Sequence, residues 1–198
     1  MRIPTTRLLA LALAAAFTGC ATRSLPKYEK PLARTEFQTV RTTAYTHSES
    51  DHRQYGRRNA MGSHLLSGSV RSAAADWSRW PAGTTFRLIE TGELYRVDDY
   101  GWALTGTNTI DLYKSSRAAM NSWGVRRVNI EVLGWGDPYR SLAILRPRGK
   151  HKHVRKMIAE LEDRRVVLQR PVQISPPLAA ANSPTQFVPP AALTPFTN

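Results

Sequence analysis

Aspartates stand where predicted strands meet turns, and they are the residues of this chain best suited to acid–base chemistry. Asp76 precedes a Pro-Gly turn, Asp98 and Asp99 end a predicted strand, and Asp111 opens the run Asp-Leu-Tyr-Lys. A carboxyl group at a strand end beside apolar residues can have a raised pKa and act as a general acid and then as a base. Aspartate in turns also caps backbone N–H groups, and spacing alone favours this structural role.

Other catalytic signatures are absent from the sequence. It has no G-x-S-x-G nucleophile elbow, no H-E-x-x-H zinc motif, no phosphate-binding loop and no G-x-G-x-x-G. His151 and His153 flank Lys152 in a basic stretch, which favours a solvated charged run over a metal site. We therefore expect no metal and no cofactor.

The N-terminus has the pattern of an export signal. Two arginines precede an apolar run at 8–17, which is too short for a spanning helix of about 20 residues and fits a signal peptide at 1–19. The run Phe17-Thr-Gly-Cys20 contains the only cysteine and resembles a lipoprotein processing site. We expect a lipid on Cys20 and an exported, lipid-anchored protein of the cell envelope, on the periplasmic face of the outer membrane. Plain cleavage after a small residue is the alternative.

The remaining chain divides by composition into four segments. Residues 20–38 are polar and aperiodic, as in a tether, and 39–147 form the predicted domain. Residues 148–170 form a basic amphipathic helix with an apolar face. Residues 171–198 hold no charged residue and 7 of the 13 prolines, which predicts an extended or disordered tail.

Period-two alternation indicates that the domain is mainly β. Runs at 84–88, 95–97 and 128–132 alternate apolar and polar residues, and glycine-rich turns separate them. Short strands with this punctuation are typical of a compact all-β barrel or sandwich. A short helix is expected near 116–123.

The formal net charge of +13 first suggests a polyanionic partner such as nucleic acid. The predicted domain carries only +4 of it, whereas 148–170 carries +5. An exported lipoprotein does not usually meet nucleic acid. We therefore expect 148–170 to bind anionic envelope polymers or lipid head groups, and expect no nucleic acid partner.

Several motifs that follow one another in order resemble the three-aspartate (3D) domain family. They are Ala44-Tyr45-Thr46, Ala74-Ala-Asp76, Pro81-Ala-Gly-Thr84, Val97-Asp98-Asp99-Tyr-Gly-Trp-Ala-Leu-Thr-Gly106, Ile110-Asp111-Leu-Tyr113 and Trp123-Gly-Val-Arg-Arg-Val-Asn-Ile-Glu-Val-Leu133. The match spans about 41–133. This family includes the catalytic domain of membrane-bound lytic transglycosylases, and the resemblance implies a double-psi β-barrel with a short helix inside the domain.

The resemblance also implies roles for individual residues. The name-giving aspartates correspond to Asp76, Asp99 and Asp111, and Asp111 matches the acid/base of the transglycosylases. Tyr45, Trp102 and Tyr113 are the implied substrate-binding residues, and Trp102 stands where the family has a second glycine.

Two functions of different classes follow. The first is a lytic transglycosylase that cleaves the MurNAc–GlcNAc bond of peptidoglycan with Asp111 as single general acid/base. The second is a non-catalytic peptidoglycan-binding module, in which Trp77, Trp80 and Trp135 stack on sugars. Packing of these tryptophans in the core is the structural alternative for them.

Overall fold

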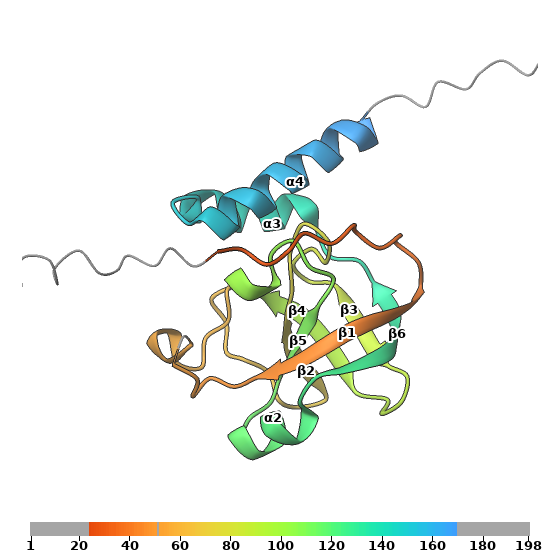
Figure 1. Cartoon of the computed structure of the whole chain (residues 1–198), viewed down its shortest axis with the longest axis vertical. Coiled ribbons are helices and arrows are strands. Elements are labelled where there is room, and N and C mark those ends of the chain that lie inside the picture. Colours follow the sequence, from red (N-terminus) through yellow and green to blue (C-terminus); the bar gives the residue numbers. More distant parts are fainter. Residues whose placement is uncertain (1–23, 51, 170–198) are drawn as a thin grey trace, which may run out of the picture.

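A computed structural model describes residues 24–50 and 52–169 of the chain, with only the backbone of 165–169. The predicted signal peptide, Cys20 and the tail at 171–198 lie outside the described residues. Within these residues the chain forms six strands and three α-helices (Figure 1). The strands are β1 (Phe37–Tyr45), β2 (Val70–Ala74), β3 (Thr85–Leu88), β4 (Leu94–Asp99), β5 (Ile110–Tyr113) and β6 (Arg126–Gly134); the α-helices are α2 (Arg117–Trp123), α3 (Pro138–Leu145) and α4 (Lys152–Gln169).

The protein is mainly β, and its single six-stranded sheet closes on itself in the order β1-β5-β2-β4-β3-β6. Two neighbouring pairs, β1 with β5 and β2 with β4, are parallel, and the other four pairs are antiparallel. Parallel neighbours need crossover connections, so segments distant in sequence meet in the sheet. This arrangement brings the ends of β4 and β5 to the two sides of β2.

Alternate residues of the strands point into the closed sheet and form the core. Leu88, Val97, Leu112 and Ile130 are fully buried there, and the ring of Phe86 stacks on Tyr95 at a centroid distance of 5.6 Å. Full burial of such a side chain contributes about 1.5–3 kcal/mol. The predicted strands at 95–97 and 128–132 are thus confirmed as parts of β4 and β6, and the one at 84–88 is confirmed as β3 except for its first residue.

The two predicted helices are present, but α4 begins at Lys152 and not at position 148, because a 3₁₀ turn that ends at Gly149 precedes it. Capping residues explain where α2 begins and ends. The Ser116 hydroxyl accepts a hydrogen bond from Ala119 N at 3.2 Å, and Gly124 ends the helix with φ of 62°, a backbone conformation that favours glycine. The expected apolar face of α4 is buried through Val154, Met157 and Leu161.

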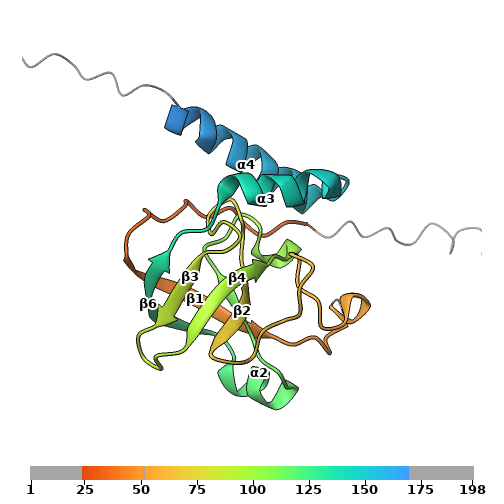
Figure 2. The same ribbon diagram turned by 180° about the vertical axis from the view of Figure 1, so that it is seen from behind.

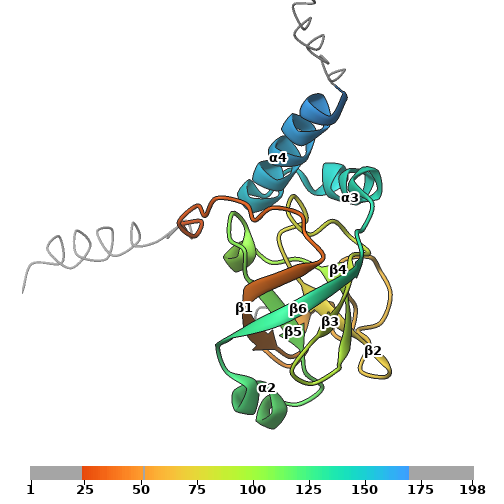
Figure 3. The same ribbon diagram turned by 90° about the vertical axis from the view of Figure 1, so that its right-hand side faces the viewer.

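A third helix, α3, was not predicted from the sequence. Asp137 caps it by accepting a hydrogen bond from Tyr139 N at 2.7 Å, and Pro138 occupies its first turn. Figure 3 shows α3 and α4 together at one end of the sheet, with α2 at the opposite end.

The described part of the predicted tether docks on the fold (Figure 2). Glu29 N donates to the Gly106 carbonyl at 2.8 Å. The ring of Tyr28 lies 5.1 Å from the guanidinium of Arg79 and 4.8 Å from the ammonium of Lys156. This irregular segment therefore joins the sheet to α4. Within the part of the chain that the structure describes, no helix is long and apolar enough to cross a membrane.

Candidate functional site

Asp99 and Asp111 lie at the same level of the sheet, on the two strands that flank β2. Ala74 of β2 pairs with Asp99 of β4 and with Asp111 of β5, and Asp111 pairs in turn with Thr43 of β1. Neighbouring strands are about 4.8 Å apart, so the two aspartate Cα atoms are roughly 10 Å apart. Directly paired residues share one face of a sheet, and this is the outer face, because the adjacent core residues Ala73 and Leu112 point inward.

A β-bulge explains why two consecutive aspartates belong to this site. Ala73 pairs with Val97 but Ala74 pairs with Asp99, so Asp98 is an extra residue in β4. Asp98 Oδ2 accepts hydrogen bonds from Ser72 Oγ at 2.8 Å and Asn59 Nδ2 at 3.0 Å. Asp98 therefore anchors the loop at 46–69 to the sheet, a role that sequence reasoning did not assign.

Asp99 is the carboxyl group of the site with the most strongly perturbed environment. It is 7% exposed, and Oδ1 accepts hydrogen bonds from Tyr100 N at 2.9 Å and Ala60 N at 3.2 Å. Burial, with a smaller contribution from the charge of Asp98, raises the pKa of Asp99 to about 7, and the hydrogen bonds oppose this shift. Asp99 thus has the pKa of a group that gains and loses a proton near neutral pH.

Asp111 is more accessible than Asp99. Asp111 is partly exposed, and its Oδ1 accepts a hydrogen bond from Thr43 Oγ1 at 2.6 Å. Burial is the main cause that raises the pKa of Tyr45 well above its usual value. The charges of Asp99, Asp98 and Asp111 raise it further. The three carboxyl groups therefore act electrostatically on one phenol, which remains a hydrogen-bond donor.

Tyr45 and Tyr113 form the wall beside the aspartates. They are 8% and 1% exposed, with ring centroids 5.5 Å apart. The hydroxyl of Tyr45 lies 3.4 Å from Asp99 Oδ2, and that of Tyr113 lies 2.8 Å from His47 Nδ1. Because both rings are buried, they orient the side chains that their hydroxyl groups contact and offer little surface on which a sugar could stack. Trp102 is partly buried in a short 3₁₀ helix, Trp102–Leu104, that follows β4.

Asp76 is not accessible at this site. It is fully buried in the turn after β2, where Oδ1 accepts hydrogen bonds from the backbone N–H and hydroxyl of Ser78 at 2.8 and 2.7 Å. Oδ2 accepts a 2.6 Å hydrogen bond from Gly106 N, whose φ of 81° favours glycine. A carboxylate enclosed in this way cannot contact a substrate, so its geometry fits the capping role that the sequence left open.

Replacing Asp76 by Asn should lower the free energy of unfolding by about 1–3 kcal/mol. The amide would turn an N–H group toward either the donors of Ser78 or that of Gly106. Urea unfolding measures the effect, and Asp137→Asn, at the exposed cap of α3, is the matched control. An Asp76→Asn protein of unchanged stability would contradict the capping role.

Replacing Asp99 by Asn should change how stability depends on pH. The unfolded carboxyl titrates near pH 3.8 and the folded one near pH 7, so between them the folded state holds the extra proton. Wild-type stability therefore loses up to about 1.4 kcal/mol per pH unit from this group as pH rises through that window. Urea unfolding should show Asp99→Asn gaining on the wild type between pH 5 and 7.5, and a constant difference would refute the raised pKa.

Two of the three tryptophans proposed for sugar stacking, Trp77 and Trp80, are packed inside the protein, and Trp135 is partly buried. Trp77 and Trp80 are 0% and 2% exposed, and Trp135 stacks on Trp80 at 5.5 Å with an interplanar angle of 16°. The expectation of exposed stacking residues is therefore wrong for Trp77 and Trp80, because both fill the core beside the turn after β2.

No group of three or more His, Cys, Asp or Glu residues in the described ranges is arranged to hold a metal ion. No protein-family model matches the chain, and no curated protein has a significantly similar sequence. A function must therefore be inferred from the geometry of the aspartates and of the tyrosines and loop that enclose them.

Proposed function

We propose that this protein is a cell-envelope lipoprotein that cleaves peptidoglycan glycan strands as a lytic transglycosylase, with Asp111 as its single general acid/base. One observation carries the proposal: Asp99 and Asp111 flank Ala74 at one level of the sheet, beside two tyrosines. Part of the proposal is that the closed sheet is a double-psi β-barrel. The parallel pairing of β1 with β5 and of β2 with β4 supports it.

The proposed reaction needs one carboxyl group and no attacking water. Protonated Asp111 gives its proton to the glycosidic oxygen, and the bond from that oxygen to C1 of the muramic acid breaks. The C6 hydroxyl of the same sugar bonds to C1 and returns its proton to Asp111, leaving a 1,6-anhydro product. A glycosidase that uses water instead needs a second carboxylate as base or nucleophile.

The surroundings of Asp99 support a single acid. Its carboxyl group is enclosed and accepts two backbone hydrogen bonds, so it is poorly placed to activate a water on a sugar. In our proposal, Asp99 and the Tyr45 hydroxyl are part of the polar surroundings of Asp111 and do not exchange a proton with the substrate. The bond from Thr43 Oγ1 fixes the carboxyl group of Asp111.

The decisive experiment is the digestion of purified sacculi with the detergent-solubilised full-length protein. The expected products are muropeptides with 1,6-anhydro ends, identified by mass spectrometry. New reducing ends would show hydrolysis and would refute the transglycosylase reaction. Retention on sacculi without any released product would instead favour the non-catalytic binding module.

We further propose that exposed cations after η3 (Arg146–Arg148) and in the first turn of α4 bind anionic envelope polymers or lipid head groups. Lys150, Lys152 and Arg155 are exposed, whereas Arg148 lies 3.3 Å from the Tyr100 hydroxyl and Lys156 packs on Tyr28. Each basic residue near an anionic surface contributes about 1 kcal/mol. Substituting the three exposed residues by Gln should weaken binding to anionic vesicles, and unchanged binding would refute this surface.

A further inference from the structure

Charged side chains gather where the closed sheet opens toward α2. Arg71 precedes the core residue Ala73 by two positions, and Lys114 follows the core residue Leu112 by two. Glu93 likewise precedes Tyr95 by two. Since strand residues two apart face the same side, the inward rows of β2, β4 and β5 each end in a charged residue at this opening.

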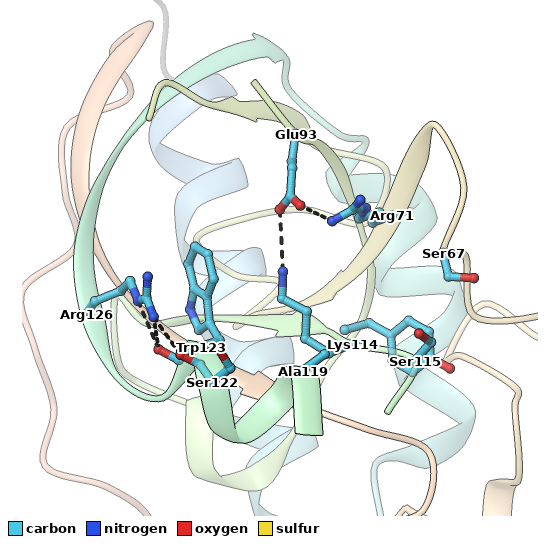
Figure 4. A pocket seen from close by; sticks show the side chains of 10 residues that line it. Ser67, Arg71, Glu93, Lys114, Ser115, Ala119, Ser122, Trp123 and Arg126 are labelled. Carbon is cyan, nitrogen blue, oxygen red and sulfur yellow. Dashed lines mark hydrogen bonds and ion pairs between the residues drawn. The ribbon is translucent and has the colours of Figure 1, made fainter. Parts of the chain in front are cut away.

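A pocket of about 380 Å³ occupies this opening (Figure 4). Its volume is at the lower end of the range of about 300–1,000 Å³ for small-molecule sites. The lining residues are Ser67, Arg71, Glu93, Tyr113, Lys114, Ser115, Ala119, Ser122, Trp123 and Arg126. The pocket thus combines cations and hydroxyl groups with the apolar surfaces of residues such as Ala119 and Trp123.

The lining carries more positive than negative charge. Glu93 is its one carboxylate, and it is shared among an ion pair with Arg71, a 3.4 Å contact with Lys114 Nζ and a 2.8 Å hydrogen bond from the Tyr95 hydroxyl. Arg126 contributes a third cation and donates only to backbone carbonyl groups at the end of α2. Since the lining has three cations and one carboxylate, two positive charges remain that no carboxylate of the lining neutralises.

One indole ring holds two of these cations in position. The ammonium of Lys114 lies 4.5 Å from the Trp123 ring centroid, and the guanidinium carbon of Arg126 lies 4.2 Å from it. The side chain of Lys114 is 10% exposed. Burial is the main cause that lowers the pKa of Lys114. Glu93 opposes this shift, and the nearby charges of Arg71 and Arg126 add to it. A bound anion would relieve this repulsion.

We propose that this pocket binds the carboxylate of a small hydroxylated acid, such as a sugar acid. Lys114 and Arg126 bind the carboxylate oxygens, and the hydroxyl groups of Ser67, Ser115 and Ser122 line the space for the remainder of the ligand. The pocket adjoins the aspartate site through Tyr113 but uses neither Asp99 nor Asp111. The inference therefore does not depend on the proposed cleavage of glycans.

Equilibrium binding to the full-length protein tests the pocket with matched ligands. D-Glucuronate, at millimolar concentrations, should shift the Trp123 indole N–H resonance, whereas D-glucose, which lacks the carboxylate, should not. D-Lactate is a smaller hydroxy acid and shows whether one hydroxyl group beside the carboxylate suffices, and its binding would also support a carboxylate site. The proposal would be overturned if neither acid bound, or if glucose bound as tightly as glucuronate. It would also be overturned if inorganic phosphate bound and neither acid did.

Variants separate this pocket from the aspartate site. Lys114→Met should weaken glucuronate binding at least tenfold, Lys114→Arg should restore most of it, and Lys27→Met, at an exposed lysine of the N-terminal segment, should not alter it. If Lys114→Met does not fold, Arg126→Gln replaces it, because Arg126 is exposed. Asp111→Asn should bind the acid normally. Unchanged affinity in the Lys114→Met or Arg126→Gln protein would refute the assignment.

Discussion

Asp111→Asn should reduce the release of anhydromuropeptides by about 10²–10⁴-fold, the usual contribution of a positioned general acid. The amide has nearly the same shape as the carboxyl group and still accepts the hydrogen bond that Thr43 Oγ1 gives at 2.6 Å. It cannot deliver a proton to the glycosidic oxygen. Initial rates of release from sacculi, measured at equal concentrations of folded protein, give the size of the effect.

Two further variants make this result specific. Asp137→Asn, at the exposed cap of α3, should retain the wild-type rate. Thr43→Val removes the hydroxyl that fixes the Asp111 carboxyl group and should cause a smaller loss than Asp111→Asn. A protein in which Asp99→Asn abolishes release and Asp111→Asn does not would contradict the assignment, and would make the buried carboxyl group the acid.

Trp77→Ala should lower the free energy of unfolding by about 3–5 kcal/mol, the typical cost of emptying a buried aromatic site. Trp77 is fully buried, its ring meets that of Tyr100 edge-on at 5.0 Å, and Nε1 donates to the Asp99 carbonyl at 2.9 Å. Trp77→Phe keeps most of the volume and loses the hydrogen bond, worth about 1 kcal/mol.

Urea unfolding followed by circular dichroism distinguishes the two roles considered for Trp77. A core residue gives a large loss for Ala and a smaller loss for Phe. A sugar-stacking residue would leave stability nearly unchanged in both variants and would reduce retention on sacculi. The second pattern would contradict the buried position of the indole.

Local patterns predicted the elements that depend on neighbouring residues. Alternation located β3, β4 and β6, and the apolar face located α4, although the predicted segment 148–170 began four residues before the observed helix at Lys152. Three strands carried weaker signals: β2 is only Val-Arg-Ser-Ala-Ala, β5 has four residues, and β1 contains three threonines. Pairing on both sides stabilises these segments, and that pairing is not visible along the chain.

The site was only partly predictable for the same reason. The sequence identified Asp99, Asp111 and Tyr45, which the structure brings together, and also Asp76, which it encloses elsewhere. Loop residues such as Asn59 and His47 contribute through contacts distant in sequence. The bulge that adds Asp98 is defined only by the register of β2 against β4. Residue type thus identified candidate acids, whereas sheet register decided which of them meet.

The docking of Tyr28 against Arg79 and Lys156 limits the distance between the fold and its proposed anchor. If Cys20 carries a lipid, eight residue steps separate that anchor from the docked Tyr28. Eight residue steps span at most roughly 30 Å, less than half the reach of the whole segment 20–38. The closed sheet would then work within a thin layer next to the membrane, and the glycan strands nearest the lipid surface would be its accessible substrates.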